Sequence, residues 1–161
     1  MNISIVLFEP DIPQNTGSMI RLAACMGVAL HIIEPCGFLL DSKALSRVAM
    51  DYGSEATIVR HLSWQHFIEY KQSHASSRLL VFSTRAHETY TEFAFQPGDM
   101  ILLGRESAGV PDYVVQAADG FLRIPLAAGT RSLNVAQAAS MALGEALRQT
   151  NLFPGSKGQQ G

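Results

Sequence analysis

The sequence is poor in lysine and in long apolar runs, and both shortages narrow the possible functions. Only Lys43, Lys71 and Lys157 are lysines among twelve basic residues, the net charge is −2, and the isoelectric point is about 6.2. Proteins that coat nucleic acid through bulk charge are far more basic, although arginines can still line a local phosphate site. No apolar run approaches the roughly 18 residues of a membrane span, so we expect no membrane association.

Cysteine is also scarce, which is informative about metal binding and about the cellular compartment of the protein. Cys25 and Cys36 form no CxxC pair, and the five histidines are scattered, so we expect no metal site. His31 lies in an apolar run and is interpreted as structural, whereas His61 is expected at the surface. The first residues look like a strand rather than the basic start of a signal peptide, so we expect a cytoplasmic protein with reduced thiols.

Apolar residues make up 47% of the 161 residues, enough for one well-formed core. We expect a single domain over 1–154 and a flexible tail over 155–161. Apolar strand-like runs alternate with helical periodicity, which predicts an α/β fold with a mostly parallel sheet covered by helices on both faces. The expected strands are 3–8, 29–33, 56–59, 78–83, 99–103 and 121–125, and the expected helices include one ending at Gly27, 42–50, one around 64–68, and 133–149.

The first candidate functional segment follows the first strand and runs from Asn15 to Arg21. Asn15 or Thr16 is the expected helix N-cap. Arg21 faces away from the apolar stripe of this helix and is expected to lean back over the first turn, where free N–H groups favour a phosphate. The alternative is a capped helix that carries a solvated arginine.

The second segment, LGRESAGVP, begins at the end of an apolar strand. Gly104 and Gly109 permit tight turning and close approach of the backbone to a ligand. Glu106 lies between them, where it could bind a ribose hydroxyl, a cationic group or a backbone N–H. Neither a phosphate-binding P-loop nor GxGxxG is present, and an ordinary turn into a helix stays open as the alternative.

The third segment runs from Arg123 to Val135 and joins a strand to the final helix through small residues. Ser132 is the expected N-cap of that helix, or a ligand contact. Asn134 is a poor helix former, so a specific partner is expected for it. The final helix is apolar over most of its surface, which predicts either a subunit interface or a deeply packed core helix.

Taken together, these three segments resemble the SPOUT superfamily of RNA methyltransferases. The order is N-x5-R, then LLGRESAGVP, then RIP-x6-SLNV before a final helix. The start, FEPDIPQNTGSMIRLAACMGVALHIIEPCGF, is similar to the small tRNA wobble-nucleotide 2′-O-methyltransferases of the TrmL (YibK) type. The resemblance covers the chain from Ile5 to about Phe153.

The resemblance implies properties that composition and periodicity do not reveal. It implies a C-terminal deep trefoil knot, a homodimer, S-adenosyl-L-methionine as methyl donor with S-adenosylhomocysteine as product, and a tRNA anticodon stem-loop as substrate. Arg21, Asn15 and Glu106 match the catalytic positions, and Arg21 is expected to clamp a phosphate and polarise the 2′-hydroxyl. The expected cofactor-binding residues are Phe82, Ser83, Gly104, Gly109, Ile124, Leu126, Ser132, Leu133 and Asn134.

One departure from the family concerns the final helix. Some relatives carry there a tyrosine associated with tRNA binding, and Gly144 occupies the matching position here. The main hypothesis is 2′-O-methylation of the wobble nucleotide, cytidine or modified uridine, of certain tRNAs. The alternatives are the same reaction on another tRNA or ribosomal RNA position, and a knotted protein that binds RNA or cofactor without turnover.

Overall fold

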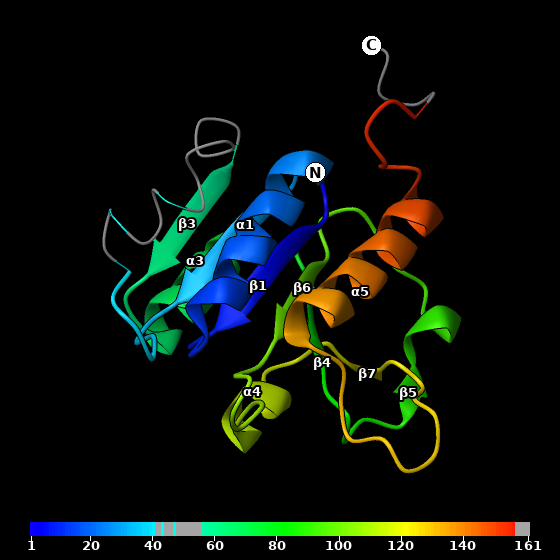
Figure 1. Ribbon diagram of the computed structural model, residues 1–161. Coiled ribbons are helices and arrows are strands. Elements are labelled where there is room, and N and C mark those ends of the chain that lie inside the picture. The colour runs from blue at the N-terminus through cyan, green and yellow to red at the C-terminus, as the bar shows by residue number, and fades with distance from the viewer. Residues whose placement is uncertain (41–42, 44–46, 48–55, 157–161) are drawn as a thin grey trace.

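A computed structural model describes residues 1–40, 43, 47 and 56–156, and it shows a parallel sheet between two layers of helices (Figure 1). Most of the helix expected over 42–50 and the end of the expected tail lie outside the described residues, and the two residues described within 42–50, Lys43 and Arg47, are helical. Within the described part, no helix is long and apolar enough to cross a membrane. The elements are β1 (Ser4–Phe8), α1 (Pro13–Met26), β2 (Ala29–Ile33), β3 (Thr57–His61), α3 (Trp64–Ser73), β4 (Leu79–Phe82), β5 (Glu88–Thr89), a 3₁₀ turn (Tyr90–Glu92), β6 (Met100–Leu103), α4 (Asp112–Gln116), β7 (Gly120–Arg123) and α5 (Val135–Thr150).

The sheet has seven strands in the order β3-β2-β1-β6-β4-β7-β5, and every pair is parallel. Every residue of β1, β4 and β6 is buried, which explains why these strands appear in the sequence as uninterrupted apolar runs. The expected α/β class with a parallel, doubly covered sheet is confirmed.

Alternate residues of each central strand supply two separate cores. In β1, Ile5 and Leu7 point to the side covered by α1 and α5, whereas Val6 and Phe8 point to the side covered by α3 and α4. Figure 1 shows α1 and α5 in front of the sheet. Helix α5 contributes five buried side chains to the first core, so its apolar surface is explained in large part by packing within this chain.

Two of the predicted helix starts are wrong. Helix α1 begins at Pro13 with Ile12 in the cap position, so Asn15 and Thr16 lie inside its first turn. Proline suits the first helical position because its fixed φ is already helical and its missing N–H costs nothing there. The cap of α5 is Asn134 rather than Ser132, which lies two residues before that cap. Gly27 ends α1 at a φ of +64°, as expected.

The expectation of a surface position for His61 is also wrong. Its exposed fraction is 5%, and His31 on the neighbouring strand is 3% exposed. The two rings stack, with Nδ1 of His31 3.0 Å from Nε2 of His61. The parallel register places His31 beside Val59 and Ile33 beside His61, so the α3 side of the sheet buries both rings against Phe67 and Tyr70.

This histidine pair makes folding stability sensitive to acid. Burial first, then the positive charges that His61 and His74 can carry, lower the pKa of His31 from 6.5 to about 4, and burial also lowers the pKa of His61. Below pH 6.5, His31 binds a proton in the unfolded chain but stays neutral in the native protein. The free energy of unfolding therefore falls as the pH is lowered to about 4. The expected loss from His31 is about 3 kcal/mol over this window.

Urea unfolding between pH 7 and pH 4.5 measures that loss. His31→Gln keeps a hydrogen-bonding side chain and removes the titration, so its stability should vary less with pH than that of the wild type. His87→Gln, at an exposed position between β4 and β5, is the control and should leave the pH dependence unchanged. An identical pH dependence in wild type and His31→Gln would contradict the assignment.

Candidate functional site

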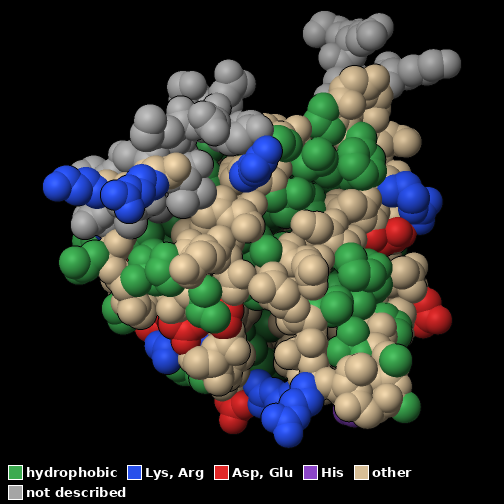
Figure 2. Space-filling view, in the orientation of Figure 1, with side chains coloured by type: hydrophobic (Ala, Val, Ile, Leu, Met, Phe, Trp, Pro, Cys, Tyr) green, Lys and Arg blue, Asp and Glu red, His purple; other side chains and the backbone are tan. Residues whose placement is uncertain are grey.

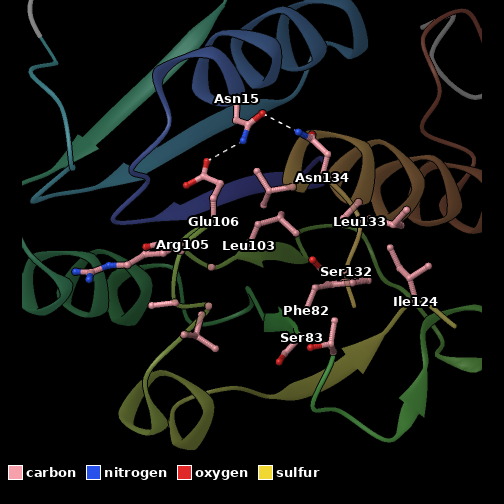
Figure 3. A pocket seen from close by; sticks show the side chains of 18 of the residues that line it. Asn15, Phe82, Ser83, Leu103, Arg105, Glu106, Ile124, Ser132, Leu133 and Asn134 are labelled. Carbon is pink, nitrogen blue, oxygen red and sulfur yellow. Dashed lines mark hydrogen bonds between the residues drawn. The ribbon is translucent and has the colours of Figure 1, made fainter. Parts of the chain in front are cut away.

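A cavity lies at the carboxyl ends of four adjacent strands. β1, β6, β4 and β7 are consecutive in the sheet, and the loops that follow them surround a cavity of about 570 Å³ (Figure 3). This is the usual position of a ligand site in an open parallel sheet, and the volume suits a nucleoside-sized ligand. Phe82, Leu103, Ile124 and Leu133 give it apolar walls, while Ser83 and Ser132 add hydroxyl groups.

Asn15 joins the three predicted segments at one edge of this cavity. Its Nδ2 donates to Oε1 of Glu106 at 3.3 Å, and its Oδ1 accepts from Nδ2 of Asn134 at 3.0 Å. Both bonds are visible in Figure 3. Asn134 in turn accepts from two backbone N–H groups at the start of α5. Because both ends of the Asn15 amide are engaged, its orientation is fixed, and so is the spacing of the three loops.

Glu106 and Asp11 form a carboxyl pair beside Asn15. The backbone N–H of Asp11 donates to Oε2 of Glu106 at 3.0 Å, and the Ser107 hydroxyl donates to the Asp11 carboxylate. Burial, followed by hydrogen bonding to the Asp11 side chain, raises the pKa of Glu106, whereas the bonds from Glu106 and Ser107 lower the pKa of Asp11. Glu106 therefore binds a proton more readily than an exposed glutamate does, and Asp11 less readily than an exposed aspartate does.

The loop from Gly104 to Gly109 closes on itself over the end of β6. Arg105 and Gly109 exchange two backbone hydrogen bonds of 2.9 Å. A Cβ atom at Gly104 would lie 2.5 Å from the carbonyl carbon of Gly109, so only glycine fits there. Gly109 has a φ of +64°, which glycine adopts without strain. These two glycines therefore set the shape of one cavity wall.

The structure brings nearly all predicted site residues to this cavity. Asn15 and Glu106 line it, and so do all nine residues predicted to bind the cofactor: Phe82, Ser83, Gly104, Gly109, Ile124, Leu126, Ser132, Leu133 and Asn134. Arg21 is the exception, since it is exposed on α1 and is not among the lining residues. The roles of these residues stay predictions. The described residues contain no cluster of three metal-ligating side chains.

Sequence reasoning missed several residues at the site. Arg85 lines the cavity, where its Nη2 donates to the Val110 carbonyl at 2.9 Å and its Nη1 lies 3.4 Å from Asp112. Asp11 is part of the carboxyl pair described above. The position of Arg85 in the loop that follows an apolar strand was available as a signal for it. Nothing in the sequence pairs Asp11 with Glu106, because the contact joins two distant loops.

Asn134 has two separable tasks, and two substitutions distinguish them. Asn134→Ala removes both the helix cap and the bond to Asn15, so unfolding free energy should fall by about 1 kcal/mol or more. Asn134→Ser keeps a capping oxygen and loses the donor to Asn15, so it should retain most of the stability. Thermal or urea unfolding measures both variants. Equal stability of Asn134→Ala and the wild type would contradict the assigned cap. Ser132→Ala should have little effect on stability, because Ser132 is not the cap.

Comparison with known proteins agrees with this arrangement. Residues 2–144 match the SpoU rRNA methylase family, and the chain belongs to that family. A protein of Ancylobacter novellus named tRNA (cytidine(34)-2′-O)-methyltransferase is 48% identical over 153 residues, covering 95% of this chain and 96% of the relative. A protein of the same name from Escherichia coli K12 is 38% identical over 156 residues, covering 96% and 97%.

Solved structures show the same fold. One, described as "Structural insights into the 2-OH methylation of C/U34 on tRNA", has a TM-score of 0.85 and 39% identity, and covers 91% of this chain and 95% of that one. The SpoU methyltransferase AviRb from Streptomyces viridochromogenes, in complex with AdoMet, has a TM-score of 0.83 and 25% identity. That match covers 92% of this chain and 60% of AviRb.

Proposed function

We propose that this protein transfers a methyl group from S-adenosylmethionine to the ribose 2′-hydroxyl of the wobble nucleotide of certain tRNAs. The single observation that carries the proposal is the cavity at the ends of β1, β6, β4 and β7, where three motif segments meet through Asn15. Relatives that span nearly the whole chain and are named for this activity support the proposal.

The residues that line the cavity fit the proposed cofactor. Phe82, Ile124 and Leu133 offer apolar surface for a purine, and loop backbone groups offer hydrogen bonds to its polar edge. Because Gly104 has no Cβ, the loop can close against Gly109 and form the wall that the cofactor would meet. When bound, S-adenosylmethionine supplies a methyl carbon on a sulfonium, and transfer leaves S-adenosylhomocysteine.

As the substrate oxygen bonds to that carbon, the bond from the methyl carbon to sulfur breaks, and the hydroxyl proton passes to the RNA phosphate or to water. An arginine stays protonated, so Arg21 would hold the RNA phosphate and polarise the hydroxyl rather than accept its proton. Asn15 and Glu106 would fix the loop geometry that orients cofactor and ribose. The proposed reaction needs no metal.

Arg21 lies outside the cavity of its own chain, and this supports a proposed homodimer in which one copy completes the other's site. Met141 on α5 has an exposed fraction of 44%, and Phe153 just beyond α5 has one of 37%. Figure 2 shows hydrophobic side chains gathered between α1 and α5 on this face. Light scattering combined with size-exclusion chromatography measures the oligomeric state of the protein. A monomer at micromolar concentration would contradict the proposed dimer.

A labelled methyl-transfer assay tests the proposed function. Protein and tritiated S-adenosylmethionine are mixed with total tRNA from cells that lack this gene, and the labelled nucleotide is then mapped by nuclease digestion. Label on the wobble 2′-O-methylnucleotide is the expected result. Label at another tRNA position, or on ribosomal RNA alone, would keep the reaction and replace the substrate. Cofactor binding without transfer to any RNA would overturn the proposal.

A further inference from the structure

Three aromatic rings gather beside the cavity, where the structure leaves one of them half exposed. Phe8 ends β1, Trp64 begins α3 and Tyr113 lies in α4. Their ring centroids are 5.9–6.2 Å apart, and every pair meets edge to face. Tyr113 is 49% exposed, whereas Phe8 is buried. The cluster therefore has a buried base and an open outer ring.

Packing of α4 leaves Tyr113 partly exposed. Val114, the next residue, is fully buried in the core on this side of the sheet and anchors the short helix. The contacts of Tyr113 with Phe8 and Trp64 cover part of its surface and leave 49% of the residue exposed. An aromatic surface of this kind offers a stacking partner for a planar ligand.

Two arginines connect this aromatic cluster with the cavity. Arg105 lines the cavity, and its guanidinium lies 6.0 Å from the Phe8 ring centroid while its Nη2 donates to Glu9 at 2.6 Å. Figure 3 shows the Arg105 side chain pointing away from the cavity centre, whereas Glu106 points toward Asn15. Arg85, 56% exposed, bridges the cavity loop to Asp112, which precedes Tyr113. Glu9 and Asp112 offset part of this charge.

We infer that Tyr113, supported by Trp64, stacks on an unpaired base of the RNA substrate next to the nucleotide that enters the cavity. The inference rests on the proposed function and adds a site of base contact to it. Single-stranded RNA is commonly held by aromatic rings that stack on bases and by arginines along the phosphates. Both kinds of group are present here. Arg85 and Arg105 lie on loops that line the cavity, and Tyr113 lies on α4, which follows the second of these loops. Stacking is tolerant of base identity, so the site supports affinity more than sequence choice.

Trp64 is the only tryptophan of the chain, which makes its fluorescence a direct probe of this cluster. Titration with an anticodon stem-loop RNA should change the Trp64 emission, since the RNA covers the neighbouring ring. Tyr113→Ala should weaken RNA binding about tenfold, within the range of one lost stacking contact, and should leave S-adenosylmethionine affinity unchanged. Tyr113→Phe keeps the ring and should bind like the wild type. Gln116→Ala, at an exposed position of the same helix, is the matched control.

A second measurement identifies the base. Stem-loops with one abasic loop nucleotide each are titrated against wild type and Tyr113→Ala. One abasic position should weaken wild-type binding about tenfold and have little effect on Tyr113→Ala, because the contact is already lost. Wild-type affinity in Tyr113→Ala, or equal losses for both proteins at every abasic position, would overturn the inference. If the wild type methylates no tRNA, the proposed function fails instead, which the transfer assay shows independently.

Discussion

Arg21→Ala should lower the rate of methyl transfer by about a hundredfold to a thousandfold while leaving S-adenosylmethionine affinity nearly unchanged. The reason is position: Arg21 is exposed on α1 and lies outside the cavity that would hold the cofactor. Its guanidinium can act on the RNA phosphate and hydroxyl, where charge develops during the reaction. Single-turnover transfer and cofactor titration measure the two quantities separately. Full activity in the variant would contradict the assigned role.

Mixing two inactive variants shows which copy supplies Arg21. Arg21→Ala and Glu106→Ala proteins are unfolded together, refolded and assayed. If each site combines Arg21 of one copy with Glu106 of the other, half of the sites in a mixed dimer are intact, and activity should return to about a quarter of wild type. If both residues act within one chain, every site carries a lesion and no activity returns. That second result would contradict the shared site.

Gly104→Ala should abolish most cofactor binding and also reduce stability. The added Cβ would meet the Gly109 carbonyl carbon at 2.5 Å and its oxygen at 2.8 Å, and backbone cannot rotate away as a side chain can. Opening the loop should cost about 1–3 kcal/mol, which corresponds to as much as a hundredfold in affinity if the loss falls on the bound state. Calorimetric titration with S-adenosylmethionine and thermal unfolding measure both effects.

Gly144→Ala is the matched control for that substitution. A Cβ at Gly144 meets no atom within 4 Å, and the residue lies inside α5. Alanine there should raise stability by about 0.5–1 kcal/mol, because it favours the helix over the unfolded chain. Cofactor affinity should be unchanged. Loss of binding in Gly144→Ala as well would show that any added methyl group disturbs the protein, and would contradict the specific role of Gly104.

The fold was predictable where residue patterns are local. Uninterrupted apolar runs located β1, β4 and β6 closely, because a strand buried on both faces has no polar positions to interrupt it. The start of α1 was missed because Asn15 is a good cap by residue type, yet its side chain bonds to Glu106 and Asn134 instead. His61 was misplaced because residue type alone does not reveal a stacking partner on the next strand.

The candidate site was predictable to the extent that it follows strand ends. Loops after neighbouring parallel strands must meet, so residues such as Ser83, Gly104 and Ser132 were expected together and line one cavity. Pairings across distant loops were not predictable, which is why the partnership of Asp11 with Glu106 was missed. The trefoil knot implied by the family resemblance stays a prediction.

The Asn15 network also governs when the site can exist during folding. Asn15 and Glu106 are 91 positions apart, and Asn15 and Asn134 are 119 apart, so no partial chain that ends before α5 contains the finished cavity. Loop closure over such distances is slow compared with local helix formation. The cavity therefore forms late in folding, once the segment that begins α5 has joined Asn15, which also binds Glu106.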